Sequence, residues 1–134
     1  MTAKEYLSQY RLLKIKINQR EQELEEYRST LGSAGINLSN NVQISPTDAL
    51  GNSVVRLLYM EAEIEEEIRR LVELKNKIIN EIHMLENPLF IEILYKRYIE
   101  CKTLWDISKE INYDYRYVKR LHGWALKAFG ERGA

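Results

Sequence analysis

The residues best suited to chemistry lie between Tyr113 and Lys127, where basic and aromatic side chains alternate with apolar ones. Arginine and lysine bind phosphates and the edges of guanine bases, so this composition suits DNA. For His122, a phosphate contact and a neutral surface position both remain open. We predict these DNA contacts: Tyr113, Tyr115, Arg116, Lys119, Arg120, His122, Gly123 and Lys127.

Two helices joined by a tight turn would position these residues. Thr103 suits the N-cap of the first helix, with Asp106 in the capping-box position. Asn112 tolerates the left-handed backbone that ends a helix, and Asp114 then caps the second helix. The apolar residues of the first helix recur three and four positions apart, as one helix face requires: Leu104, Ile107 and Ile111.

The second helix is predicted to have one apolar face and one basic face. Its apolar stripe is Val118, Leu121, Ala125 and Phe129. We expect Val118 and Leu121 to be buried against Ile107 and Ile111, which leaves the basic face for the major groove of DNA. The alternative is a helical hairpin whose charges only keep it soluble.

These helices resemble region 4 of bacterial sigma factors. The likeness rests on Tyr98, Lys102 to Ile107, Ile111 to Tyr113, Val118, Arg120 to His122, and Ala125-Leu126. It covers about the C-terminal third of the chain, and Trp124 stands where sigma-like sequences often have a basic residue. With its opening MTAKEYL and charged helices, the whole chain looks like small prophage proteins of the ArpU and RinA type. The resemblance implies double-stranded DNA as a partner, and RNA polymerase as a second one.

Composition sets outer limits on the function. The 134 residues allow one domain, or a small domain with an extended element, and the net charge is zero. Residues 88–134 hold nine bases and six acids, whereas residues 47–87 hold five bases and nine acids, so only the C-terminal part suits a polyanion. No apolar run is long enough for a membrane span, and a single cysteine, Cys101, makes the cytoplasm the expected location.

Two long helices are predicted before this part. The first begins at the capping box Thr2–Glu5 and ends at Gly32, and a flexible connection follows at 32–44. The second begins at Ser45-Pro46 and ends at Asn87-Pro88, which also starts a third helix, 88–99. The heptad seam of the first helix is Tyr6, Tyr10, Leu13, Ile17, Leu24, Tyr27 and Leu31. The seam of the second is Leu50, Val54, Leu57, Ile64, Ile68, Leu71, Ile78, Ile82 and Leu85.

The two seams match in an antiparallel register in which paired residue numbers sum to 81. Leu31 then meets Leu50, Ile17 meets Ile64, and the polar breaks Arg20 and Glu61 form an ion pair. The last seam residues of the second helix would pack on the DNA-binding unit: Ile78, Ile82 and Leu85.

The sequence therefore predicts an all-α protein: a long antiparallel coiled-coil hairpin at 1–87, then a three- to four-helix helix-turn-helix domain at 88–134. We find no catalytic constellation, metal-ligand spacing or cofactor motif, so we expect no enzyme, metal or cofactor. The predicted function is a phage or prophage transcriptional regulator that forms a homodimer through the coiled coil. A DNA-packaging adaptor of the small-terminase kind and a structural coiled coil without DNA binding are the alternatives.

Overall fold

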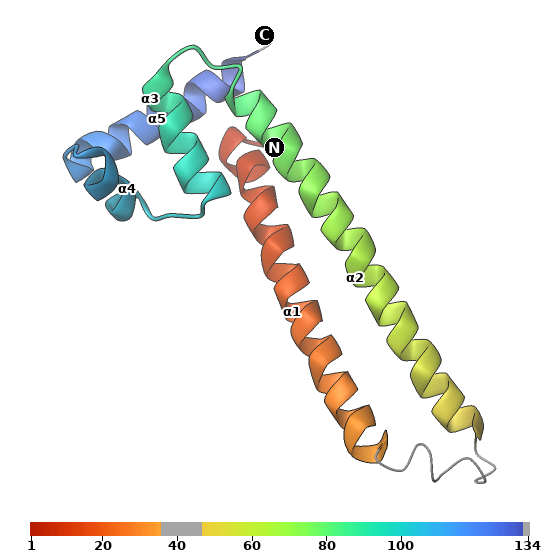
Figure 1. Cartoon of the computed structure of the whole chain (residues 1–134). Coiled ribbons are helices and arrows are strands. Elements are labelled where there is room, and N and C mark those ends of the chain that lie inside the picture. Colours follow the sequence, from red (N-terminus) through yellow and green to blue (C-terminus); the bar gives the residue numbers. More distant parts are fainter. Residues whose placement is uncertain (36–46, 133–134) are drawn as a thin grey trace. The chain divides into compact units, whose positions relative to one another are not determined.

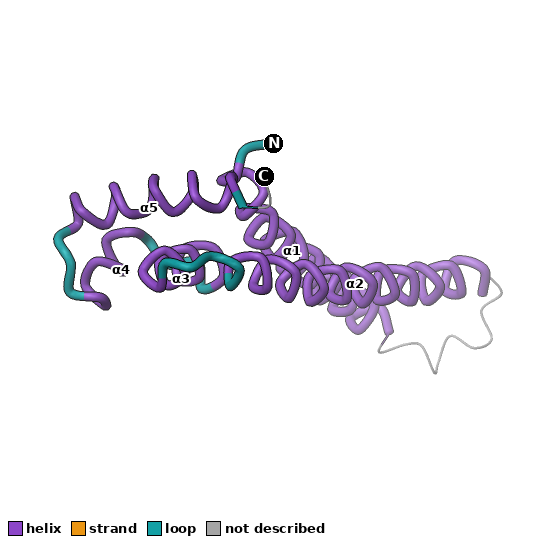
Figure 2. The backbone as a smooth tube through the Cα atoms, turned by 90° about the horizontal axis from the view of Figure 1, so that it is seen from above, coloured by secondary structure: helices purple, strands orange, loops and turns teal. Residues whose placement is uncertain are grey.

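The computed structural model describes residues 1–35 and 47–132, and this part of the chain is helical throughout, apart from short connections (Figures 1 and 2). A five-residue π-helical segment, Tyr95–Ile99, continues α3. The predicted all-α class and the antiparallel pairing of α1 with α2 are confirmed. The helices are α1 (Ala3–Gly35), α2 (Thr47–Ile82), α3 (Pro88–Leu94), α4 (Leu104–Ile111) and α5 (Tyr115–Glu131). None of these helices combines the length and apolar character needed to cross a membrane.

The predicted ends of the two long helices are only partly correct. The capping box at Thr2 is confirmed, because the Thr2 hydroxyl accepts a hydrogen bond from the Glu5 amide at 3.1 Å. The predicted end at Gly32 is wrong: α1 continues to Gly35. A glycine inside a helix costs only about 1 kcal/mol relative to alanine, which neighbouring residues readily offset. The remainder of the predicted connection and the Ser45-Pro46 start lie outside the described residues.

The second long helix ends earlier than the sequence indicated. It stops at Ile82, and the amides of Met84 and Leu85 bond back three residues, to Glu81 and Ile82. This tighter bonding replaces the α-helical pattern before the chain reaches Asn87. The predicted start of α3 is confirmed, since the Asn87 side chain accepts a hydrogen bond from the Leu89 amide at 2.9 Å.

The chain forms two compact units, which we describe separately. We call residues 1–14 and 71–134 the core unit, and residues 15–70 the hairpin unit. The sequence placed its domain boundary between residues 87 and 88, which stays a prediction. The core unit includes the start of α1 and the end of α2, because these ends contribute buried side chains to the same cluster as α5.

The core unit contains two clusters of buried apolar side chains. The smaller one is Ile93, Ile107, Val118 and Leu121, with Ile111 packed against it, so the predicted packing of α4 on α5 is confirmed. The larger one is Leu7, Tyr10, Ile78, Ile82, Leu94, Tyr98, Ile99, Ala125 and Phe129. The predicted packing of Ile78 and Ile82 on this region is also confirmed, and Leu85 lies partly buried beside them.

Leu7 is fully buried although the predicted seam of α1 passes through Tyr6 and omits it. A heptad seam describes contact with one neighbouring helix. The first turns of α1 share a cluster with residues of α2, α3 and α5, so a wider face is buried there. The position of Leu7 therefore depends on the tertiary structure rather than on the heptad spacing.

Among the described residues of the hairpin unit, the buried apolar side chains are those of Ile17, Leu24 and Ile64. The predicted Arg20–Glu61 ion pair is wrong. Arg20 pairs with Glu63 at 3.2 Å and Glu67 at 3.1 Å, and Glu61 pairs with Arg28 at 2.8 Å. These long side chains reach the edge of the helix contact, where water remains, instead of lying inside the seam.

Two other predicted seam residues, Val54 and Ile68, are exposed. The Tyr27 hydroxyl, which the predicted register placed at Val54, donates to the carbonyl of Ser53 at 3.0 Å. The side chain of Leu50 lies outside the described residues, so its pairing with Leu31 stays a prediction. Two paired helices bury only a narrow stripe of each, and the hairpin unit accordingly leaves much apolar surface open.

Candidate nucleic-acid interface

The turn between α4 and α5 is set by local backbone chemistry. The Thr103 hydroxyl accepts a hydrogen bond from the Asp106 amide at 3.1 Å, as the capping box predicted. Asn112 takes the left-handed conformation (φ 59°, ψ 41°) and ends α4. Asp114 occupies the N-cap position of α5, but its side chain makes no capping hydrogen bond there. The predicted helix boundaries are therefore confirmed, whereas the side-chain cap predicted for Asp114 is not.

The inner face of α5 is apolar and buried, which determines what the outer face presents. All four predicted residues of the apolar stripe are buried: Val118, Leu121, Ala125 and Phe129. Deeply buried side chains at steps of three and four residues hold a helix in one rotational setting. The opposite face of α5 is consequently held toward solvent.

Four cations of α5 lie exposed: Arg116, Lys119, Arg120 and Lys127. Within the described part of the chain, none of the four makes an ion pair. Lys119 lies over the ring of Tyr115, with its Nζ 4.6 Å from the ring centroid. The helix has no acidic residue before Glu131, so its outer face carries uncompensated positive charge.

Two cations near α4 in the core unit are ion-paired. Lys102 lies 2.8 Å from Glu100 and 2.6 Å from Glu110, and Lys96 lies 3.5 Å from Glu110. The hydrogen bonds that Lys102 donates to Glu100 and then to Glu110 raise the pKa of Lys102 above its usual range. The four cations on the outer face of α5 thus differ from Lys96 and Lys102, which have acidic partners within the unit.

A row of exposed aromatic side chains lies beside these cations. We call Tyr113, Tyr117 and Trp124 the aromatic row; their exposed fractions are 44%, 38% and 50%. The Tyr117 ring lies between the other two, 5.6 Å from Tyr113 and 6.3 Å from Trp124. The sequence analysis identified Tyr113 but missed Tyr117 and Trp124 as site residues. Their seven-residue spacing, which puts them on one helix face with Arg120, is the signal that points to them.

The predicted contact Tyr115 is turned partly inward. Its ring meets Trp105 of α4 edge-on at 5.4 Å, which links the two helices beside the turn. Trp105 itself is exposed, and Lys109 lies over its ring, with the lysine Nζ 4.5 Å from the centroid of the Trp105 ring. Tyr115 therefore supports the α4–α5 arrangement through its ring, and its DNA contact stays a prediction.

His122 is held in the protein by a long-range contact. Its Nε2 lies 2.7 Å from the hydroxyl of Tyr98, and the two rings stack with centroids 5.7 Å apart. Burial, with smaller contributions from Arg97 and Lys4, lowers the pKa of His122 to about 4. The imidazole is therefore neutral near pH 7 and supplies no positive charge to the interface. The predicted phosphate contact of His122 stays a prediction.

Gly123 is exposed in the middle of α5. A Cβ added there would meet no atom within 4 Å, so the packing of the protein gives no reason for a glycine. Glycine inside a helix costs stability relative to alanine, and it is useful where another molecule approaches the backbone closely. Its predicted role as a DNA contact requires such a close approach to the helix backbone.

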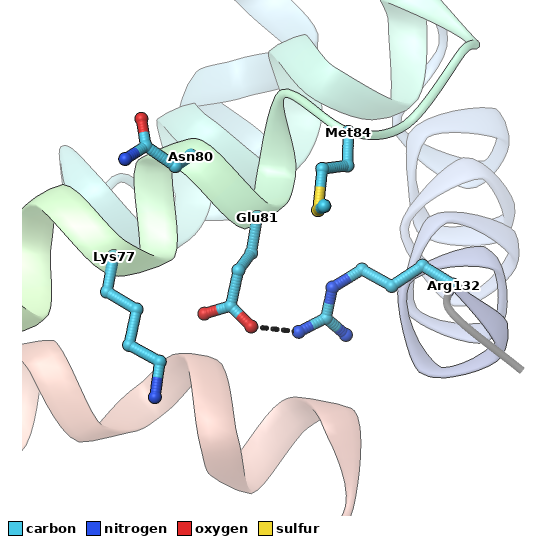
Figure 3. Close-up of a pocket in the computed structure, with 5 residues that line it drawn as sticks. All are labelled: Lys77, Asn80, Glu81, Met84 and Arg132. Atoms are coloured by element: carbon cyan, nitrogen blue, oxygen red, sulfur yellow. Dashed lines mark hydrogen bonds and ion pairs between the residues drawn. The ribbon is translucent and has the colours of Figure 1, made fainter.

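A second polar cluster joins the start of α1, the end of α2 and the end of α5. Glu81 accepts hydrogen bonds from the Tyr6 hydroxyl and from Arg132. Figure 3 shows Glu81 and Arg132 bonded to each other in the lining of a surface pocket of about 750 Å³. Burial and then the hydrogen bond to Glu81 raise the pKa of Tyr6 to about 12. Arg132 also donates to the carbonyl of Phe129 at 2.8 Å. Because each group has a partner within the protein, the cluster secures the end of α5 rather than offering free charge.

Comparisons of the chain with protein-family models, with curated proteins and with solved structures find no match.

Proposed function

We propose that this protein is a sequence-specific transcriptional regulator of the phage type, which binds double-stranded DNA with α5 as its recognition helix. The observation that supports the proposal is the exposed charge of Arg116, Arg120 and Lys127, which have no ion-pair partner in the described residues and lie opposite a buried face. A helix held by one face, with free arginines on the other, matches the requirements of the major groove.

The net charge of the whole chain is zero, so binding depends on this local charge rather than on a general attraction to polyanions. Affinity for DNA should fall as salt rises, because phosphate contacts release counterions. Removing one phosphate contact lowers the slope of log affinity against log salt by about 0.9.

The decisive experiment compares two double variants that remove the same charge. Duplexes selected from a random DNA pool by the full chain are titrated by fluorescence anisotropy. The test variant is Arg116→Ala with Arg120→Ala. The matched control is Arg20→Ala with Arg28→Ala, because both of these arginines are ion-paired within the hairpin unit.

The test variant is expected to lose affinity by about 1–3 kcal/mol for each arginine that reads a base, without a large change in thermal midpoint. The control should bind almost as tightly as the natural chain. Equal binding by all three proteins would refute α5 as the recognition helix, and no binding by the natural chain would refute the function itself.

We further propose that the hairpin unit joins two copies of the chain. On α2, three exposed apolar residues lie at spacings of three and one: Val55, Leu58 and Tyr59. A surface of this kind suits a second pair of helices, because these apolar side chains lie in water unless another surface covers them. Dimers also double the DNA contacts of a single small motif, which by itself gives limited specificity.

The test of self-association is the solution mass of the natural chain and of Leu58→Glu, measured by sedimentation equilibrium. We expect a dimer that becomes a monomer in the variant. A monomeric natural chain would contradict the dimer, and a large ring that binds DNA would favour a packaging adaptor over a regulator.

A further inference from the structure

The aromatic row and two arginines form one continuous stripe on α5. Arg116, Arg120 and Trp124 follow each other at steps of four, and Tyr117 lies three residues before Arg120. Tyr113, just before the helix, joins the stripe through its ring contact with Tyr117. The same surface therefore presents both positive charge and exposed aromatic area.

We infer that the aromatic row reads thymine, by contacting C5-methyl groups in the major groove beside the bases that Arg116 and Arg120 reach. The inference rests on the proposed DNA binding and adds the base chemistry of the site. The methyl group of thymine is the apolar group that a base edge presents in this groove, and apolar side chains recognise it by contact.

The geometry of the row favours duplex DNA over a single strand. Neighbouring rings of the row meet at 59° and 79°, so they form a ridge of edges and partial faces instead of a set of parallel plates. A single strand is bound in a basic groove where bases stack on ring faces. The row lies on a helix surface that projects into solvent. Such a surface can insert into the major groove of a duplex, but it does not provide a groove that would hold a single strand.

Charge favours DNA over a protein as the occupant of this surface. The exposed apolar area of the row is flanked by Arg116, Arg120 and Lys127, and α5 has no acidic residue before Glu131. A partner that covers the row must accept this charge. The phosphates on both sides of a major groove do so, while its base edges meet the rings.

The test replaces thymine by uracil, which lacks the methyl group and keeps every hydrogen-bonding group. A duplex selected by the natural chain is made with uracil at each thymine position in turn, and affinities are measured by fluorescence anisotropy. At the positions that meet the row, loss of one methyl contact should weaken binding about fourfold. Trp124→Ala and Tyr117→Ala should each bind the thymine duplex more weakly and lose part of the discrimination.

Trp105→Ala is the matched control, because Trp105 is as exposed as Trp124 but lies on α4, outside the row. It should keep the full thymine preference. Equal affinity for thymine and uracil duplexes at every position would overturn the inference, while binding that still depends on Arg116 and Arg120 would leave the proposed function standing.

Two further outcomes would also overturn the inference. Tighter binding of a selected single strand than of its duplex would make the row a stacking surface. Unchanged DNA affinity in the double variant Tyr117→Ala with Trp124→Ala would assign the row to a protein partner. Absence of DNA binding by the natural chain would remove both the inference and the proposed function.

Discussion

In the hairpin unit, Arg20 lies within 3.2 Å of Glu63 and Glu67, and Arg28 lies 2.8 Å from Glu61. On α5, Arg116 and Arg120 have no acidic partner among the described residues. Both surfaces are helical and exposed, and both carry arginines, so the presence of arginine alone does not separate them. They differ in whether the protein neutralises its own charges.

This difference indicates which charges are available to another molecule. An exposed ion pair contributes little to stability, but it reduces the field that its charges project into solvent. The arginines of α5 keep that field because none of the described acids forms an ion pair with them. The number of basic residues in each region does not show how much positive charge is available for binding. The positions of the acidic partners do.

The largest effect on stability should come from the buried face of α5, which holds the exposed arginines in place. Leu121→Ala removes a buried side chain from the cluster of α4 and α5, and should cost about 2–5 kcal/mol of unfolding free energy. Leu12→Ala is the control, because Leu12 is exposed on α1, and it should change stability by less than about 0.5 kcal/mol. Urea denaturation of both variants measures the difference, and equal losses would contradict the assigned buried face of α5.

A pH experiment tests whether His122 belongs to the core or to the charged face. The pKa of His122 in the folded chain, about 4, is below the usual 6.5, so the unfolded chain binds its proton more readily. The stability that depends on neutral His122 is present above pH 6.5 and is lost as the pH falls toward 4.

Between pH 7 and pH 5 we therefore expect the thermal midpoint of the natural chain to fall more than that of His122→Gln. His83→Gln is the control, since His83 is exposed on the segment after α2, and it should behave like the natural chain. The same pH dependence in all three proteins would show that His122 is protonated as easily in the folded state as in the unfolded one.

A substitution at Gly123 should change the stability of α5 and its DNA affinity in opposite directions. Gly123→Ala should raise the unfolding free energy by about 0.5–1 kcal/mol, because the new Cβ meets no atom of the protein within 4 Å. The same methyl group should weaken DNA binding if DNA approaches the helix backbone there. Gly51→Ala on α2 also meets no atom within 4 Å, and it should stabilise the chain without changing DNA affinity. Unchanged DNA affinity in Gly123→Ala would remove Gly123 from the interface.

The smallest effect should come from the ion pairs of the hairpin unit. A double-mutant cycle on Arg20→Ala and Glu67→Ala should give a coupling of about 0.2–1 kcal/mol, as exposed and partly buried pairs do. The cycle on Arg20→Ala and Glu61→Ala is the control and should be additive. Stronger coupling to Glu61 than to Glu67 would restore the pairing that the sequence predicted and weaken the comparison between the two surfaces.

Local patterns determined much of this protein from sequence alone. The caps at Thr2, Asn87 and Thr103, the turn at Asn112 and the buried stripe of α5 all follow from residues within a few positions of one another. Hydrogen bonds of this kind and the 3.6-residue helical period are short-range, so a sequence states them directly. The eight predicted contact residues come from the same kind of reasoning, and their DNA contacts stay predictions.

The tertiary structure alone decided which distant groups meet. Leu7 is buried because several helices cover the start of α1, His122 is held by Tyr98 from 24 positions earlier, and Arg20 selects Glu63 and Glu67 over Glu61. Residue spacing does not encode these contacts, because they depend on how separate helices are rotated and how far long side chains reach. The α5 arginines are a similar case: the sequence supplies the charges, and the fold leaves them without an ion-pair partner among the described residues.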